Sequence, residues 1–208
     1  MKSPMKYKDE QKENPLIAKP ELFQAALDEF SQKSFNEASL NDILKAVQMN
    51  KGSFYHRFYD KTDLYLCMME MIALDKMEYM RDKISVPQMP LDFFEQIRLL
   101  AISGLEYARH EKRYYNFWRN YLSENEELKN IVKKTFPGFG DDLFEQLVTQ
   151  AVASGNLNSR YSNEFICKTV SIYFYNLDAF LTDSIDDKDI VAIIDQFIDF
   201  LKHGLLNS

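Results

Sequence analysis

The sequence predicts an all-α protein with about nine helices, in which a small N-terminal three-helix domain precedes a larger helical domain. Apolar residues recur at three- and four-residue spacing along most of the 208 residues, which is the pattern of a buried helix face. From residue 91 onward, no segment alternates apolar and polar residues as a strand does. Two short helical patterns lie close together within residues 39–58. We therefore expect a flexible tail over residues 1–15, the three-helix domain over 16–76 and the larger domain over 77–208.

The first helix of the small domain is expected to begin near Pro20. Proline suits the first turn of a helix, because its missing N–H would have no partner within the helix. The residues that follow place a broad apolar face on one side, formed by Leu22, Phe23, Ala26, Leu27 and Phe30.

Residues 39–58 are typical of a helix-turn-helix motif. Ser39 is a favourable N-cap for a short helix, and Asn50 is a second N-cap candidate only eleven positions later. Two helices of about two turns each must therefore be joined by a tight corner at Gln48 and Met49. The first of them is expected to bury Leu40, Ile43, Leu44 and Val47.

The second helix of this motif separates apolar from polar residues. At about 100° per residue, Phe54 and Phe58 fall on one side and belong to the core. The other arc suits a DNA major groove: Gly52 admits close approach, residues at the helix start can reach base edges, and residues near its end can reach phosphates. The residues predicted to bind DNA are Ser39, Asn50, Lys51, Gly52, Ser53, Tyr55, His56 and Lys61.

Three runs of the sequence resemble the DNA-binding domain of the TetR family of bacterial transcriptional regulators. Residues 22–30 resemble the first helix of that domain, residues 51–58 its recognition helix, and residues 61–64 the entry into its fourth helix. The resemblance covers about residues 16–76. It implies a homodimeric, ligand-responsive repressor that binds double-stranded DNA at a near-palindromic operator.

Two residues depart from the family's pattern, because Ser34 and Gln48 stand where the family usually has glycine. Glycine at such a position relieves a positive φ at a helix end. We therefore expect both corners to be rebuilt or mildly strained. The departures also support an alternative function, an all-helical protein-interaction or ligand-binding module with a vestigial DNA-binding head.

Charge is distributed unevenly along the chain, whose net charge is −7. Residues 1–61 hold ten Lys and Arg against nine Asp and Glu, so the acidic excess lies in residues 62–208. Within residues 39–61, four basic residues stand against two acidic ones, and this modest basic patch favours DNA binding by two copies. Residues 1–15 mix lysines with acids, and the alternative to a flexible tail is an arm that lies along DNA.

A longer helix is expected from Thr62 to about Lys83, where it would connect the two domains. Asp60 and Asp63 bracket its start in a capping arrangement. Helical patterns then continue from residue 91, with breaks near residues 110, 123, 137, 155 and 183.

Aromatic and methionine residues are dense between the small domain and the last two helices. Such residues at helical spacing are more often core than ligand contacts, and a core that needs no ligand is the alternative here. Together they favour a pocket for a small apolar or aromatic effector. The residues selected for it are Met68, Tyr107, Phe117, Trp118, Tyr121, Phe144 and Tyr173.

The last two helices are expected over residues 163–181 and 187–205, and both carry more apolar surface than one neighbour would cover. Two such helices from each of two chains would form the four-helix dimer interface that the resemblance implies. A thick monomer core is the alternative. The predicted interface consists of Phe165, Tyr173, Leu177, Phe180, Ile194, Phe197, Ile198 and Leu201.

Several function classes find no support in the sequence. No G-x-S-x-G, P-loop or G-x-G-x-x-G motif occurs, so we predict no enzyme. Cys67 and Cys167 lie far apart and the three histidines share no ligand spacing, so we predict free thiols and no metal site. No apolar run approaches the ~20 residues of a membrane helix. We expect a cytoplasmic protein with no cofactor besides the effector.

Overall fold

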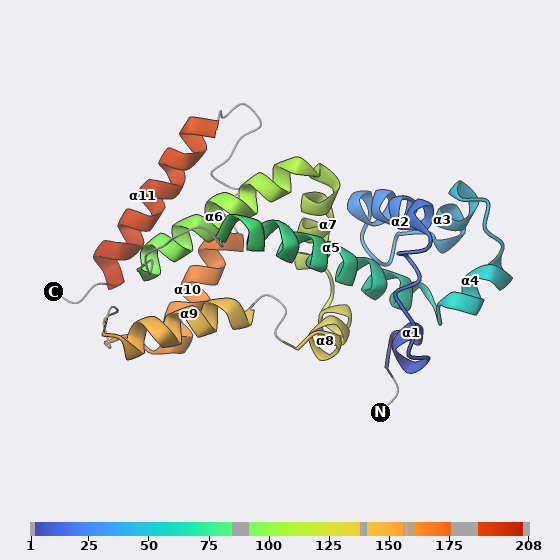
Figure 1. Ribbon diagram of the computed structural model, residues 1–208, viewed down its shortest axis with the longest axis horizontal. Helices are drawn as coiled ribbons and strands as arrows, with labels where there is room; N and C mark the ends of the chain where they lie inside the picture. The colour runs from blue at the N-terminus through green and yellow to red at the C-terminus, as the bar shows by residue number, and fades with distance from the viewer. Residues whose placement is uncertain are drawn as a thin grey trace. The chain divides into compact units, whose positions relative to one another are not determined.

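The computed structural model describes residues 3–84, 92–137, 141–155, 157, 160–175 and 187–205, and the elements within these ranges are all helices (Figure 1). This confirms the predicted all-α class, with eleven helices described where about nine were expected. The helices are α1 (Lys6–Asp9), α2 (Pro20–Gln32), α3 (Leu40–Ala46), α4 (Lys51–Arg57), α5 (Lys61–Ile84), α6 (Phe93–His110), α7 (Lys112–Leu122), α8 (Glu126–Thr135), α9 (Asp141–Ala153), α10 (Asn163–Tyr175) and α11 (Asp187–Leu205).

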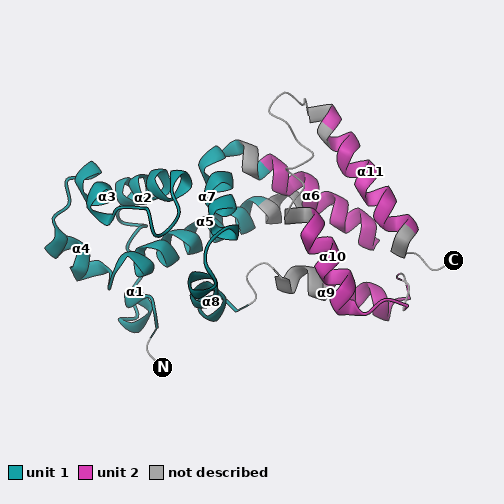
Figure 2. Cartoon of the chain, turned by 180° about the vertical axis from the view of Figure 1, so that it is seen from behind, with its two compact units in different colours: residues 1–79, 107–137 teal, residues 80–106, 138–208 magenta. Residues whose placement is uncertain are grey.

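The chain forms two compact units that are not two consecutive stretches of sequence. Unit 1 contains residues 1–79 and 107–137, and unit 2 contains residues 80–106 and 138–208 (Figure 2). The division expected after residue 76 lies close to the first boundary at residue 79. It differs from the structure over residues 107–137, because α7 and α8 belong to unit 1.

The core of unit 1 joins the small N-terminal helices to α5 and α7. The apolar face predicted for α2 is buried, and α7 packs against it. Tyr65 of α5 lies at the centre, with its ring centroid 5.0 Å from that of Phe30 and 5.1 Å from that of Phe117 of α7. Three helices as short as α2, α3 and α4 bury little apolar surface by themselves, so α7 completes their core.

Polar side chains of α7 and of the turn that follows it bond to backbone groups at and just after the C-terminal end of α2. The Asn120 side-chain amide donates to the Phe30 carbonyl at 3.0 Å, and the Glu124 carboxylate accepts from the Phe35 N–H at 2.5 Å. The predicted rebuilding occurs at Ser34, whose hydroxyl donates to the Glu37 carboxylate at 2.6 Å. This corner therefore turns by side-chain hydrogen bonds, without glycine.

The corner between α3 and α4 keeps the geometry that usually requires glycine. The Gln48 N–H donates to the Lys45 carbonyl, the Met49 N–H donates to the Leu44 carbonyl, and Gln48 has a φ of 52°. These are the two hydrogen bonds and the left-handed residue of a Schellman motif. The expectation of mild strain is thus confirmed at Gln48, because a side chain in this region crowds its own backbone.

Replacing Gln48 by glycine is therefore expected to raise the free energy of unfolding by about 1 kcal/mol. Urea denaturation followed by circular dichroism measures the change. Lys45→Gly is the matched control, because this exposed residue lies within α3, where glycine costs up to about 1 kcal/mol. Equal destabilisation by both substitutions would contradict the assignment of strain to Gln48.

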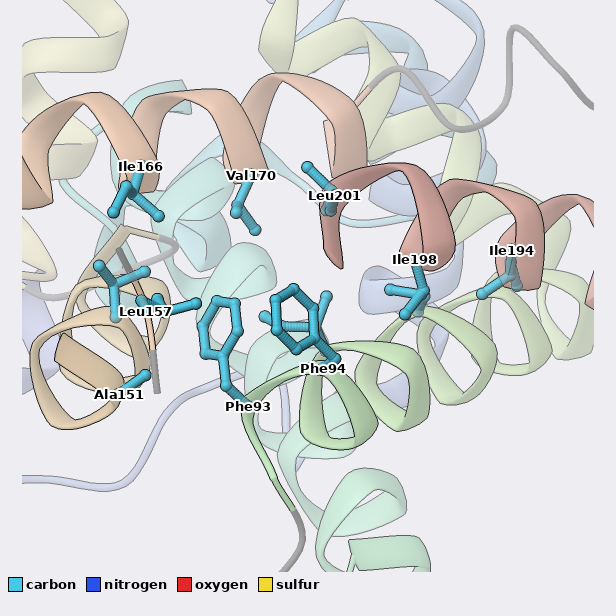
Figure 3. Close-up of a cluster of buried hydrophobic side chains, with 12 residues drawn as sticks. Phe93, Phe94, Ala151, Leu157, Ile166, Val170, Ile194, Ile198 and Leu201 are labelled. Atoms are coloured by element: carbon cyan, nitrogen blue, oxygen red, sulfur yellow. The ribbon is translucent and has the colours of Figure 1, made fainter. Parts of the chain in front are cut away.

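Unit 2 has its own apolar core between α6, α9, α10 and α11 (Figure 3). Phe93 and Phe94 of α6 lie at its centre, and the Arg98 guanidinium binds both carboxylate oxygens of Asp195 on α11. This core includes Ile194, Ile198 and Leu201, which are 1%, 8% and 3% exposed. These three side chains, which were predicted for a dimer interface, pack within their own chain and keep little exposed surface.

Candidate nucleic-acid interface

Both helices of the predicted helix-turn-helix begin with the capping residues expected from the sequence. The Ser39 hydroxyl accepts a hydrogen bond from the Asp42 N–H at 3.2 Å, and the Asn50 side-chain oxygen accepts one from the Ser53 N–H at 2.8 Å. These bonds satisfy N–H groups that a helix start leaves without partners. The structure thus gives both capping side chains a structural role at the start of the helices that would contact DNA.

The surface of α4 is divided as predicted. Phe54 and Phe58 are fully buried, with ring centroids 5.1 Å apart. Lys51, Gly52 and His56 are exposed, Ser53 is half-buried, and Tyr55 is 49% exposed. A Cβ added at Gly52 would lie 3.3 Å from the capping oxygen of Asn50, so glycine keeps this end of the helix both open and capped. The structure brings these five residues together on one seven-residue helix.

Lys61, the last of the predicted DNA-binding residues, holds the corner between α2 and α3. Its ammonium donates to the carbonyls of Phe35 at 2.6 Å and Ala38 at 2.9 Å, and lies 4.5 Å from the centre of the Phe35 ring. Partial burial lowers the pKa of this ammonium. The sequence did not reveal this role, because both carbonyl partners lie more than twenty residues away.

The N-terminal strap (residues 3–16) is packed within unit 1, so the flexible tail expected over residues 1–15 is corrected for the residues described. Met5 and Leu16 are fully buried, and the Asn14 amide donates to the Cys67 carbonyl at 2.9 Å. The strap's composition is polar, but two of its apolar residues are buried and several of its polar groups bond to α5. The spacing of Met5, Tyr7 and Leu16 was the only sequence feature that could have indicated this.

A buried carboxylate near the end of α4 was not predicted as a functional residue. Asp63 is fully buried, and one of its oxygens accepts the N–H of Tyr59 at 2.8 Å and the N–H of Lys6 at 3.1 Å. Its other oxygen accepts from the Cys67 thiol at 3.4 Å. Burial raises the pKa of this carboxyl, and the backbone hydrogen bonds act against that shift. Sequence reasoning had identified only its capping position.

Five of the seven residues predicted for the effector pocket lie in unit 1. Met68, Tyr107 and Phe117 are buried in unit 1, where the Tyr107 hydroxyl donates to Asp75 at 2.7 Å. Trp118 and Tyr121 are half-buried in the same unit, Tyr173 belongs to unit 2, and the side chain of Phe144 lies outside the described residues. Two surface grooves, of about 210 and 450 Å³, are lined by other residues of unit 1.

Exposed apolar side chains mark one part of unit 2. Phe165 and Ile172 on α10 are 54% and 61% exposed, and Phe200 on α11 is 65% exposed. The ring of Tyr173 on α10 faces α11, with its centroid 4.4 Å from that of Phe197 and 6.4 Å from that of Phe200. Of these, Ile172 and Phe200 were not among the residues predicted for the dimer interface. Leu177 and Phe180 lie outside the described residues.

Among the residues described, no group of His, Cys, Asp and Glu side chains is arranged to hold a metal ion. The described helices also include none with the length and apolar character of a membrane span. Cys67 and Cys167 are free thiols.

Residues 22–68 match the family described as bacterial regulatory proteins, tetR family. A probable acrEF/envCD operon repressor from Escherichia coli K12 is 30% identical over 96 residues, which cover 46% of this chain and 43% of that protein. The chain spans less than half the length of the curated relatives it matches.

Two solved structures share the fold over most of the chain. A TetR family transcriptional regulator from Chloroflexus aurantiacus has a TM-score of 0.73 at 24% identity, covering 91% of this chain and 93% of its own. The transcriptional regulator FadR from Bacillus subtilis, in complex with stearoyl-CoA, has a TM-score of 0.63 at 15% identity, with coverages of 88% and 97%.

Proposed function

We propose that this chain, whose residues 22–68 match the tetR family of bacterial regulatory proteins, is a homodimeric transcriptional repressor that a small ligand releases from DNA. The observation that carries the proposal is the surface of α4. Its apolar side is anchored by Phe54 and Phe58, while Lys51, Gly52 and Tyr55 remain exposed on a helix with an intact N-cap. An exposed helix with this composition suits a DNA major groove.

The proposed contacts divide between bases and backbone. Lys51 and Ser53 reach base edges beside Gly52, whereas Tyr55 and His56 contact phosphate oxygens. Lys61 has a structural role in this proposal and does not contact DNA, since its ammonium donates to the carbonyls of Phe35 and Ala38. The intact corner at Gln48 argues against a vestigial head, because the motif keeps its hydrogen bonds without the glycine.

Dimerisation is proposed through α10 and α11. Phe165, Ile172 and Phe200 expose apolar surface there, and such surface is favourable to bury against a second copy. Two copies would present two α4 helices to half-sites about 34–36 Å apart on a near-palindromic operator. Two DNA-binding domains acting together would also raise the affinity for DNA, because each one carries only a modest positive charge.

The effector is proposed to be a small, largely apolar or aromatic molecule. The support is the density of aromatic residues in the chain and the acyl-CoA complex of the structurally similar FadR. Such a ligand releases the protein from DNA only to the extent that it binds the released conformation more tightly than the DNA-bound one. The repressor direction is supported by the operon repressor to which the chain is similar.

The test is selection of DNA by the purified full chain from a pool of random duplexes, followed by sequencing of the retained fraction. We expect an inverted repeat whose affinity falls steeply with salt concentration, because phosphate contacts release counterions. A protein that retains no duplex at low salt would overturn the proposed function.

Lys51→Ala is expected to weaken binding to the selected duplex by about 1–3 kcal/mol, roughly 5- to 150-fold, as for a residue that contacts bases. Lys133→Ala on α8 is the control, because it removes the same charge from an exposed position outside the motif. Fluorescence anisotropy titration compares both with the wild type. Equal affinities for the two variants would contradict the assignment of Lys51 to the interface.

A further inference from the structure

The end of α4 lacks one hydrogen bond that a continuing helix would have. In such a helix the Tyr55 carbonyl would accept from the N–H of Tyr59, four residues later. The Tyr59 N–H donates instead to the Asp63 carboxylate at 2.8 Å. The Tyr55 carbonyl accepts a hydrogen bond from the Lys6 ammonium at 2.8 Å. A residue nearly fifty positions earlier in the chain thus completes the last turn of the proposed recognition helix.

The position of Lys6 is fixed by the strap that carries it. Its backbone N–H donates to the same Asp63 oxygen that receives the Tyr59 N–H, so one carboxylate joins the strap to the end of α4. The Tyr59 hydroxyl also donates to Asp9 of α1 at 2.9 Å. Lys6 itself is mostly covered, with a side-chain exposure of 17%. Its ammonium therefore has a fixed position against α4.

A second carboxylate holds the strap two helical turns farther along α5. Glu70 accepts hydrogen bonds from the Tyr7 hydroxyl and from the Asn14 amide, and forms an ion pair with Lys8 at 2.8 Å. Residues seven positions apart, such as Asp63 and Glu70, lie on one face of a helix. The strap is therefore attached along one face of α5, and burial of Met5 and Leu16 adds apolar anchoring at both its ends.

We propose that the N-terminal strap sets the orientation of the recognition helix through Lys6, which acts as a positioning residue for DNA binding and not as a DNA contact. This inference rests on the proposed function of α4. A cation at the C-terminal end of a helix stabilises its last carbonyl groups. Loss of the Lys6 ammonium would remove the one described hydrogen bond from the strap to a carbonyl of α4, and leave the contacts that Tyr59 makes with Asp63 and Asp9.

The test compares Lys6→Met with Lys12→Met in the full chain. Methionine retains an apolar stem but no donor, and Lys12 is the matched control because its side chain is 63% exposed and its ammonium pairs with Glu10 within the strap. Hydrogen exchange is measured first, without DNA. In Lys6→Met we expect the α4 amides to exchange about five- to ten-fold faster, with α2 amides unchanged, as for loss of one intramolecular hydrogen bond. Unchanged exchange in α4 would overturn the proposal.

Binding to the selected duplex is measured second, over a range of salt concentrations. Lys6→Met is expected to bind about five- to ten-fold more weakly, with the same slope of log affinity against log salt, whereas Lys12→Met keeps the affinity within about two-fold. If the slope of log affinity against log salt were smaller in magnitude by about one in Lys6→Met, Lys6 would contact a phosphate, and the positioning role would be overturned. An unchanged affinity of Lys6→Met for the duplex would overturn that role too. If the wild type bound no duplex but exchange in α4 still depended on Lys6, the proposed function would fail while the strap's hold on α4 would stand.

Discussion

Replacing Ile172 by aspartate is expected to convert the proposed dimer into a monomer. Ile172 is 61% exposed on α10, seven positions after the exposed Phe165 and therefore on the same helix face. An ionised carboxylate buried in such an apolar contact lacks a partner, and the cost of several kcal/mol exceeds what one contact of this size returns. Light scattering should then give the chain mass of 24.5 kDa in place of twice that mass.

The same substitution is expected to weaken binding to the inverted repeat by roughly 100-fold or more, because a monomer loses the effective concentration of its second head. Gln150→Asp is the control, since it adds the same charge at an exposed position of α9 in unit 2. A wild-type mass of 24.5 kDa at micromolar concentration would refute the dimer itself. A variant that stays dimeric would place the interface elsewhere.

Replacing Phe117 by alanine is expected to lower the free energy of unfolding of unit 1 by about 3–5 kcal/mol. Phe117 is 1% exposed, and its ring contacts the ring of Tyr65 at the centre of the core. Truncation there leaves a cavity among aromatic side chains that cannot collapse freely. A loss of this size is a large part of the roughly 5–15 kcal/mol by which folded domains are stable.

Urea denaturation measures this loss, with Ile17→Ala as the control in the same unit. Ile17 is 60% exposed, so its truncation should change stability by no more than about 0.5 kcal/mol. A Phe117→Ala variant as stable as the control would mean that α7 is not part of the core around α2. The expected result would show that a fragment ending at residue 76 lacks part of its own core.

The effects of Phe117 and Ile172 also show where sequence reasoning reached its limit. Phe117 was selected for an effector pocket because it is aromatic, but its burial against Tyr65 makes it a core residue of unit 1. Ile172 was counted as one apolar residue among many on its helix. Periodicity identifies an apolar face, and it does not say whether the same chain or another covers that face.

The features that depend on neighbouring residues could be predicted from the sequence. The caps at Ser39 and Asn50, the strained corner at Gln48 and the two sides of α4 follow from capping, backbone sterics and the 3.6-residue period, which act within a few positions. The tertiary structure alone decided the features that join distant residues. The strap meets Asp63 across 57 positions, Glu124 meets the end of α2 across 89, and α6 meets α11 across 97. Such pairings depend on the path of the whole backbone, and no local pattern in the sequence encodes them.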